Sequence, residues 1–174
     1  KSGLYQDVIV HNFGRSDESS AGCGAPFEGG VVLESNPINL PYVGYGVSQV
    51  LPIIVDMIRG ENSQDYVIQQ PEVHLHPKAQ AALGEFVFEF ASLQDKWFFI
   101  ETHSDYLIDR FRLSMSKASK ETTRPVSSVV FFERDKGLNQ SAFIPIQPDG
   151  KYSEDQPSSS REFFLNESID LMKI

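Results

Sequence analysis

Long hydrophobic runs, a secretory leader and paired cysteines are all missing from this sequence of 174 residues. No apolar stretch approaches the roughly 18 to 20 residues that span a bilayer, and no charged-then-apolar leader opens the chain. Cys23 is the single cysteine, so no intrachain disulfide can form. We therefore expect a soluble, cytoplasmic protein with no membrane partner, consisting of one domain or lobe whose core closes without disulfides.

A phosphate-binding loop is also missing. That loop requires G-x-x-x-x-G-K-[ST], because its backbone amides and its lysine together hold the phosphates. The glycines between residues 16 and 30 have no lysine in this register, and Gly150-Lys151 is followed by Tyr152. The chain therefore supplies no phosphate cradle of this type.

Positive charge is scarce. The 15 lysines and arginines face 24 aspartates and glutamates, a net charge of −9. This balance argues against nucleic-acid binding over the whole surface. A local exception lies between Asp109 and Arg124, where five basic side chains accompany two acidic ones. Two interpretations are open for this stretch: a solvated helix face, or a contact with DNA.

Hydrophobic periodicity predicts alternating strands and helices after a loop-rich start. Strands are expected at residues 31–33, 66–69, 97–100, 126–133 and 141–146, the last two as a hairpin around 136–137. Helices are expected at residues 47–58, 77–90 and 105–115. Strand alternating with helix predicts an α/β fold with a mainly parallel sheet.

We divide the chain into three parts. Residues 1–40 form a loop-rich N-terminal segment with a short strand, 41–147 the main lobe, and 148–174 a polar linker and C-terminal helix. The capping box Ser159-x-x-Glu162 opens that last helix.

Local signals predict how the elements begin. Ser48 is a candidate N-cap, which would place Pro52 at the fourth helical position, so we expect that helix to start later or to kink. Pro77 suits the first position of the next helix, and Ser104 suits the N-cap of the third. The strand at 97–100 is continuously apolar, which predicts that both of its faces are covered.

Two polar clusters follow neighbouring strands. Gln69 to Pro77 follows the first, and Glu101 to Asp105 follows the second. Ligands of parallel sheets bind at the carboxyl ends of the strands, where helix N-termini also point. We therefore expect both clusters to line one crevice.

Three motifs, in this order, resemble the C-terminal lobe of ABC-type ATPases. They are Gly44-Tyr45-Gly46-Val47-Ser48-Gln49, the strand end running from Gln69-Gln70-Pro71-Glu72 to Leu75-His76-Pro77, and Glu101-Thr102-His103-Ser104. The nearest group is the AAA-like proteins related to the overcoming-lysogenization-defect nucleases, to Rad50 and to SMC proteins. The resemblance spans Pro41 to Arg112 and implies a P-loop NTPase-like sheet flanked by helices.

The resemblance implies that the chain binds ATP between two heads. The first motif would be the signature motif, which contacts the γ-phosphate held by the opposite protomer through Gly44, Gly46, Ser48 and Gln49. The usual signature serine does not align cleanly, because Gly44 takes its place. Glu72 and His74 would belong to the D-loop, which crosses the dimer interface.

The remaining matched residues would serve the nucleotide of their own protomer. Gln69 and Gln70 would occupy the Walker B positions, with Gln69 as the Mg²⁺ ligand and Gln70 as a catalytic residue. His103 would be the switch histidine on the γ-phosphate. Glu101 would polarise water or ligate magnesium; pairing with a neighbouring cation is the equally open alternative.

The two glutamines depart from the family pattern, which generally has an acid at the Gln69 position. An amide oxygen can ligate Mg²⁺ but brings no charge, and Gln70 cannot act as a carboxylate base. A lost general base costs roughly 10² to 10⁴ in rate, although glutamine can still orient water. We expect ATPase activity impaired by Gln69 and Gln70, with a degenerate nucleotide-binding scaffold as the alternative.

The resemblance also implies partners. An N-terminal lobe with the P-loop, on the same polypeptide or on a partner chain, would complete the sheet, since the apolar strand at 97–100 would otherwise be a bare edge. A homodimer, a nuclease effector in DNA processing or phage defence, and DNA are the other expected partners. A zinc hydrolase built on His74, His76 and His103 is a further alternative from a different class.

Overall fold

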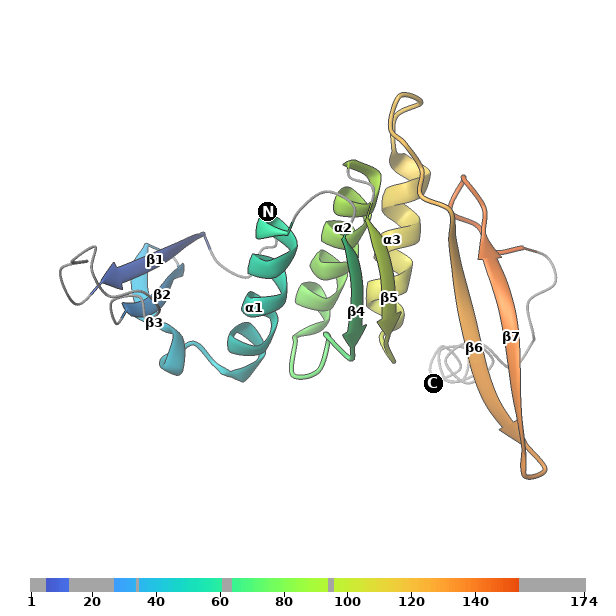
Figure 1. Cartoon of the computed structure of the whole chain (residues 1–174), viewed down its shortest axis with the longest axis horizontal. Helices are drawn as coiled ribbons and strands as arrows, with labels where there is room; N and C mark the ends of the chain where they lie inside the picture. Colours follow the sequence, from blue (N-terminus) through green and yellow to red (C-terminus); the bar gives the residue numbers. More distant parts are fainter. Residues whose placement is uncertain (1–5, 13–26, 34, 61–63, 94–95, 154–174) are drawn as a thin grey trace, which may run out of the picture. The chain divides into compact units, whose positions relative to one another are not determined.

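The computed structural model describes residues 6–12, 27–33, 35–60, 64–93 and 96–153. The chain, shown in Figure 1, divides into two compact units, Lys1–Phe111 and Arg112–Ile174. Within the described residues, no helix combines the length and the apolar character that crossing a membrane requires. The predicted C-terminal helix from Ser159 lies outside the described residues.

A three-stranded antiparallel sheet opens the first unit. Its strands are β1 (Asp7–Asn12), β2 (Phe27–Leu33) and β3 (Asn36–Asn39), with β2 in the middle, followed by a 3-10 helix η1 (Leu40–Tyr42). The sequence predicted only a short strand at 31–33, which is the end of β2. The structure adds β1, whose apolar run covers only three residues, and β3, whose single aliphatic residue is Ile38, and neither gives a clear alternation.

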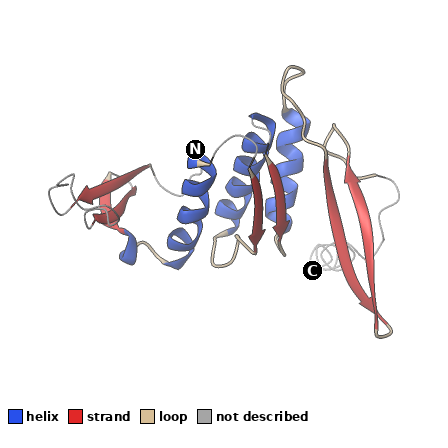
Figure 2. Cartoon of the chain, in the orientation of Figure 1, coloured by secondary structure: helices blue, strands red, loops and turns tan. Residues whose placement is uncertain are grey.

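Helices and strands then alternate as predicted. The elements are α1 (Tyr45–Arg59), β4 (Asp65–Gln69), α2 (Pro77–Leu93), β5 (Trp97–Glu101) and α3 (Asp105–Lys117), and α3 continues across the boundary into the second unit (Figure 2). β4 and β5 pair in parallel, whereas the other two sheets are antiparallel. The α/β class is therefore confirmed, but the expectation of a mainly parallel sheet holds for these two strands alone.

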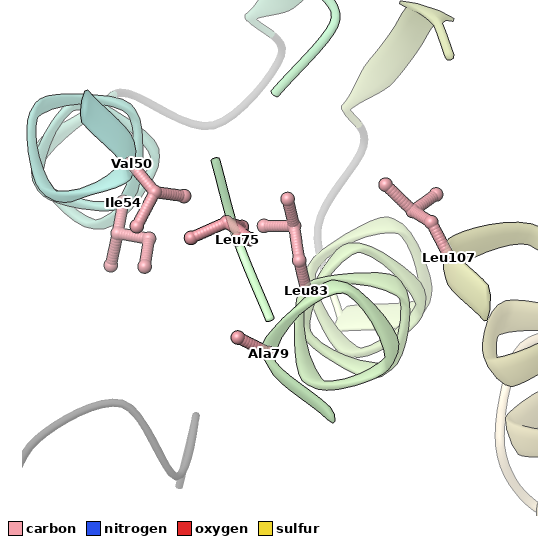
Figure 3. Close-up of a cluster of buried hydrophobic side chains, with 6 residues drawn as sticks. All are labelled: Val50, Ile54, Leu75, Ala79, Leu83 and Leu107. Carbon is pink, nitrogen blue, oxygen red and sulfur yellow. The ribbon is translucent and has the colours of Figure 1, made fainter. Parts of the chain in front are cut away.

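Two hydrophobic clusters form the core of the first unit: one joins the helices to one another, and the other joins the helices to the strands. Figure 3 shows the first, formed by side chains from α1, α2, α3 and the loop before α2: Val50, Ile54, Leu75, Ala79, Leu83 and Leu107. The second centres on Met57, Tyr66 and Val87, with Ile68, Phe98 and Ile100 packed against it. All three helices thus cover the face of the sheet that carries Tyr66 and Phe98.

The opposite face of β4 and β5 is apolar and exposed, which corrects the prediction for the strand at 97–100. Val67 is 85% exposed, Trp97 59% and Phe99 60%. Both strands have a partner on one side only, since the described residues form a two-stranded sheet here. The continuous apolar run indicated burial on both faces, but the described residues cover only one.

Helix α1 begins earlier than predicted. Its N-cap is Gly44, and Pro52 lies inside the helix. Ser48 is the fourth helical residue instead of the N-cap, and its hydroxyl donates to the carbonyls of Leu40 (3.1 Å) and Gly44 (3.3 Å). The expectations of a Ser48 cap and a later start were therefore wrong. Gly44 and Gly46 occupy the beginning of the helix, and glycine gives no sign of a helix in a sequence pattern.

The second unit contains the predicted hairpin. β6 (Ser127–Asp135) and β7 (Leu138–Ile146) pair antiparallel, with Asp135 opposite Leu138. Lys136 and Gly137 connect them with φ of 47° and 85°. Two positive φ angles are the mark of a type I′ turn, whose twist suits a two-residue hairpin loop.

Candidate functional site

The carboxyl ends of β4 and β5 lie together, as the sequence predicted. Gln69 pairs with Glu101 in the parallel ladder, so their side chains leave the same face of the sheet. The backbone N–H of Gln70 donates to the Glu101 carbonyl at 2.8 Å, and its side-chain Nε2 donates to Glu101 Oε1 at 3.3 Å. Three of the predicted site residues therefore form one polar group at this edge.

The loop from Gln70 to His76 leaves β4 through an unusual backbone. Gln70 and His74 have φ of 44° and 65°, in the left-handed region that non-glycine residues rarely adopt. Two turn hydrogen bonds hold the loop, from Val73 N–H to the Gln70 carbonyl and from Leu75 N–H to the Glu72 carbonyl. Residues in such conformations cost on the order of 1 kcal/mol each and cluster at functional sites.

Glu72 ties this loop to the one after β5. Its Oε1 accepts the backbone N–H of His103 at 2.7 Å, and the residue is only 6% exposed. Its second oxygen, Oε2, is buried and has no hydrogen-bond partner among the described residues. The side chain that the resemblance assigns to the dimer interface therefore contacts the loop after β5 in its own chain, while the His103 side chain in that loop is exposed.

Ser104, the residue after His103, is also joined to the segment that follows β4. Gln80, in the first turn of α2, donates from Nε2 to the Leu75 carbonyl at 2.9 Å, and its Oε1 accepts the hydroxyl of Ser104 at 2.6 Å. Ser104 Oγ also accepts the N–H of Leu107 at 3.1 Å, which confirms Ser104 as the N-cap of α3. His76 caps α2 in the same way, accepting the N–H of Lys78 on Nδ1.

The beginning of α1 packs against the same loop. Gly46 is buried, and a Cβ on it would meet the His74 carbonyl at 2.5 Å. The rings of Tyr45 and His74 meet edge to face, with centroids 4.8 Å apart. Gly44 has φ 86° and ψ 147°, a conformation essentially restricted to glycine. The glycines of the predicted signature motif are therefore needed for this close approach and this backbone.

The ten residues predicted as site residues fall into two neighbouring groups. Gln69, Gln70, Glu72, Glu101 and His103 surround the two strand ends, whereas Gly44, Gly46, Ser48 and Gln49 lie at the start of α1, and His74 joins the groups. Gln49 Oε1 is buried without a hydrogen-bond partner in the described part of the chain. Sequence reasoning missed Gln80, since a glutamine inside a helix gives no distinctive pattern, and it gave no role to Tyr45 although this residue lies within the predicted signature motif.

The zinc alternative gains no support. Within the ranges that the structure describes, which include His74, His76 and His103, no group of three histidine, cysteine, aspartate or glutamate side chains could hold a metal ion. His76 uses Nδ1 as a helix cap, and His74 packs against Tyr45.

Three of the five basic side chains between Asp109 and Arg124 contact other groups of the protein. Arg110 pairs with Glu85 at 3.1 Å, Arg112 stacks on Tyr152 at 3.6 Å, and Arg124 donates to the Ala118 carbonyl. Lys117 and Lys120 are exposed. These contacts favour a structural role for the arginines and leave the two lysines as candidates for a DNA contact.

A protein-family model described as "AAA ATPase domain" matches residues 5–108. A solved structure described as "Structural biochemistry of ATP-driven dimerization and DNA stimulated activation of SMC ATPases" has a TM-score of 0.54 and 10% sequence identity, covering 94% of this chain and 83% of that chain. At this identity the similarity concerns the fold alone. Among curated proteins, no sequence matches significantly.

Proposed function

From the premise that this chain belongs to the AAA ATPase domain family, we propose that it is the C-terminal lobe of an ABC-type ATPase head. In this proposal two heads bind ATP and Mg²⁺ between them. ATP acts mainly as a clamp that closes the dimer. The observation that carries the proposal is the convergence of Gln69, Gln70, Glu101 and the His103 loop at one edge of a parallel sheet.

His103 is the residue that we assign to the γ-phosphate. It lies exposed between the carboxyl end of β5 and the N-terminus of α3, which begins at Asp105. A helix N-terminus carries partial positive charge and free amide donors, so it favours an anion such as a terminal phosphate. The His103 imidazole adds a directed donor at the same place.

Glu101 is the residue that compensates for the neutral Walker B positions. It is exposed, lies opposite Gln69 in the ladder, and supplies the carboxylate that a hard cation prefers. The side-chain oxygens of Gln69 and Glu101 are of the type that Mg²⁺ prefers. Together they bring a single negative charge, fewer than a site with an acid at both positions. Gln69 and Glu101 would hold the ion, and Mg²⁺ would supply neutralisation of phosphate charge there.

Gln70 orients water in this proposal instead of accepting a proton. Its Nε2 donates to Glu101, which fixes the direction of the side chain. A glutamine held in this way can align the attacking water, as in GTPases, but provides no base. Slow turnover follows, since the loss of a general base costs roughly 10² to 10⁴ in rate.

An N-terminal lobe with the P-loop is the partner that we propose for β4 and β5. Their second face exposes Val67, Trp97 and Phe99, and each strand has one neighbour only in the described part of the chain. Natural proteins rarely leave such an apolar edge open, because it pairs with other chains. Additional strands and a further layer would cover both the edge and the face.

The start of α1 is the surface that we assign to the opposite protomer. Tyr45 is 70% exposed and Gly44 is exposed, so this helix start lies at the surface, and the N-terminus of a helix favours an anion such as a phosphate. A DNA-processing or phage-defence effector, including a nuclease, is proposed from the family resemblance alone. No residue of this chain is assigned to it.

The test uses the complete head, including the N-terminal lobe. We expect Mg²⁺-dependent ATP binding, ATP-dependent dimerisation and slow release of phosphate. Gln69→Glu supplies a charged ligand, so phosphate release should rise by roughly tenfold or more where weak Mg²⁺ binding limits the rate. A complete head that binds neither ATP nor ADP in millimolar Mg²⁺ would overturn the proposal.

A catalytically degenerate scaffold is the second candidate. One observation favours it: both residues assigned to the Walker B positions, Gln69 and Gln70, are amides, which provide neither a charged Mg²⁺ ligand nor a base. A scaffold would bind ATP and dimerise without phosphate release, and Gln69→Glu would not create activity. Phosphate release by the wild-type head would reject the scaffold, release by Gln69→Glu alone would indicate a lapsed or altered catalytic site, and inactivity of both proteins would support the scaffold.

A further inference from the structure

We propose that Glu72 is a positioning residue that sets the orientation of His103 toward the terminal phosphate of ATP. The inference rests on the proposed function, because it concerns the same site. It assigns to Glu72 a role within its own chain, through the backbone of His103.

The contact is direct. Glu72 Oε1 accepts the His103 N–H at 2.7 Å, a short bond for a backbone donor and a charged acceptor. A bond to the backbone fixes the peptide plane before His103, and therefore the direction in which its Cα–Cβ bond leaves the loop. The imidazole is exposed while the anchoring carboxylate is buried. The Glu72 carboxylate thus fixes the His103 backbone from the buried side, and the His103 ring stays accessible to a ligand.

The cost of the arrangement argues against simple packing. Glu72 is 6% exposed, and Oε2 has no partner in the described part of the chain. Burying a carboxylate with an unpaired oxygen is unfavourable, and an apolar residue of similar size would fill the space without this penalty. The nearby N-terminus of α3 offsets part of the cost. We therefore explain this unfavourable buried carboxylate by the residue that it positions, His103.

The neighbouring residue is held by an independent bond. Ser104 donates to Gln80, whose amide also binds the Leu75 carbonyl. Two successive residues before α3 are therefore tied to the loop and helix that follow β4. Removing Glu72 frees His103 but leaves Ser104 and the cap of α3 in place, so the variant can fold while the histidine loses its orientation.

The first measurement is hydrogen exchange in the complete protein without nucleotide. Glu72→Ala removes the acceptor, and we expect the His103 amide to exchange about 10 to 100 times faster, as for loss of a hydrogen bond to a charged group. Glu72→Gln keeps an oxygen acceptor and should retain most of the protection. Glu85→Ala is the matched control: it removes a carboxylate on α2 that contacts α3 through Arg110, and it should leave His103 unchanged.

The second measurement is the ratio of ATP to ADP affinity. ADP lacks the γ-phosphate, so misorientation of His103 should weaken ATP binding by about tenfold and leave ADP binding nearly unchanged. A general structural defect would weaken both nucleotides equally. In a His103→Ala background, Glu72→Ala should cause no further loss of ATP affinity, because coupled residues are not additive.

The outcomes separate this inference from the proposed function. If the wild-type head prefers ATP and Glu72→Ala keeps that preference, the positioning role is overturned while the ATPase proposal stands. If the wild-type head binds no nucleotide, both are overturned. Should Glu72→Ala fail to fold, Glu72→Asp, which withdraws the carboxylate by one methylene, is expected to show the same ATP-selective loss, and an unchanged ratio would again overturn the role.

Discussion

The carbonyl oxygen of His74 lies 2.5 Å from the point that a Cβ atom on Gly46 would occupy. Real Cβ atoms essentially never approach another atom this closely, and here the obstacle is backbone. The start of α1 and the loop after β4 are therefore fitted to each other at a distance that only glycine permits. This contact joins the predicted signature motif to the predicted D-loop.

Gly46→Ala should destabilise the protein by about 1 to 3 kcal/mol, because the added methyl forces α1 and the loop apart. Urea unfolding of the complete protein measures the change. Ser48→Ala, two residues along the same helix, is the control. It loses the hydroxyl bonds to the carbonyls of Leu40 and Gly44 without adding any atom, so it should cost less than Gly46→Ala, about 0.5 to 1 kcal/mol. Equal stability of Gly46→Ala and wild type would contradict the close contact.

Lys96 should contribute to stability by completing the end of α1. The residue is 6% exposed, and its Nζ donates to the carbonyls of Met57 (3.0 Å) and Gly60 (3.3 Å). Lys96→Met leaves these acceptors without a donor, so we expect a loss of about 1 to 3 kcal/mol in urea unfolding. The exposed Lys78→Met should be near neutral. A Lys96→Met protein as stable as wild type would show that water replaces the amine.

The exposed face of β4 and β5 should make the isolated chain self-associate. Phe99 is 60% exposed beside Val67 and Trp97. Phe99→Lys should lower the associated fraction in sedimentation velocity, because it places a charge on the apolar face. Leu93→Lys, at an apolar position that is 80% exposed at the end of α2, is the control and should have a smaller effect. A wild-type chain that stays monomeric at high concentration would contradict the prediction.

The hairpin turn should accept a stabilising substitution. Lys136 has φ 47° directly before Gly137, and asparagine adopts this conformation at lower cost than lysine. Lys136→Asn should raise stability by about 0.5 kcal/mol, measured by thermal unfolding. Lys120→Asn, at an exposed residue without a positive φ, is the control. A lower melting temperature for Lys136→Asn would reject the type I′ assignment.

Local patterns predicted the elements that depend on a few adjacent residues. Pro77 begins α2, Ser104 caps α3, and the turn at 136–137 joins the hairpin, because caps, prolines and turn residues act within one or two turns of chain. Ser48 shows the limit of this reasoning. Its hydroxyl suited an N-cap, but the approach of the loop after β4 to Gly46 let the helix begin at Tyr45.

The sequence by itself determined the alternation of strand and helix and the meeting of two polar clusters at neighbouring strand ends, since both follow from periodicity and from the geometry of parallel strands. Only the tertiary structure decided that Glu72 turns inward to the His103 amide, 31 residues away, and that Trp97 and Phe99 stay uncovered. Such facts depend on which distant segments pack together, and no local preference of a side chain encodes them.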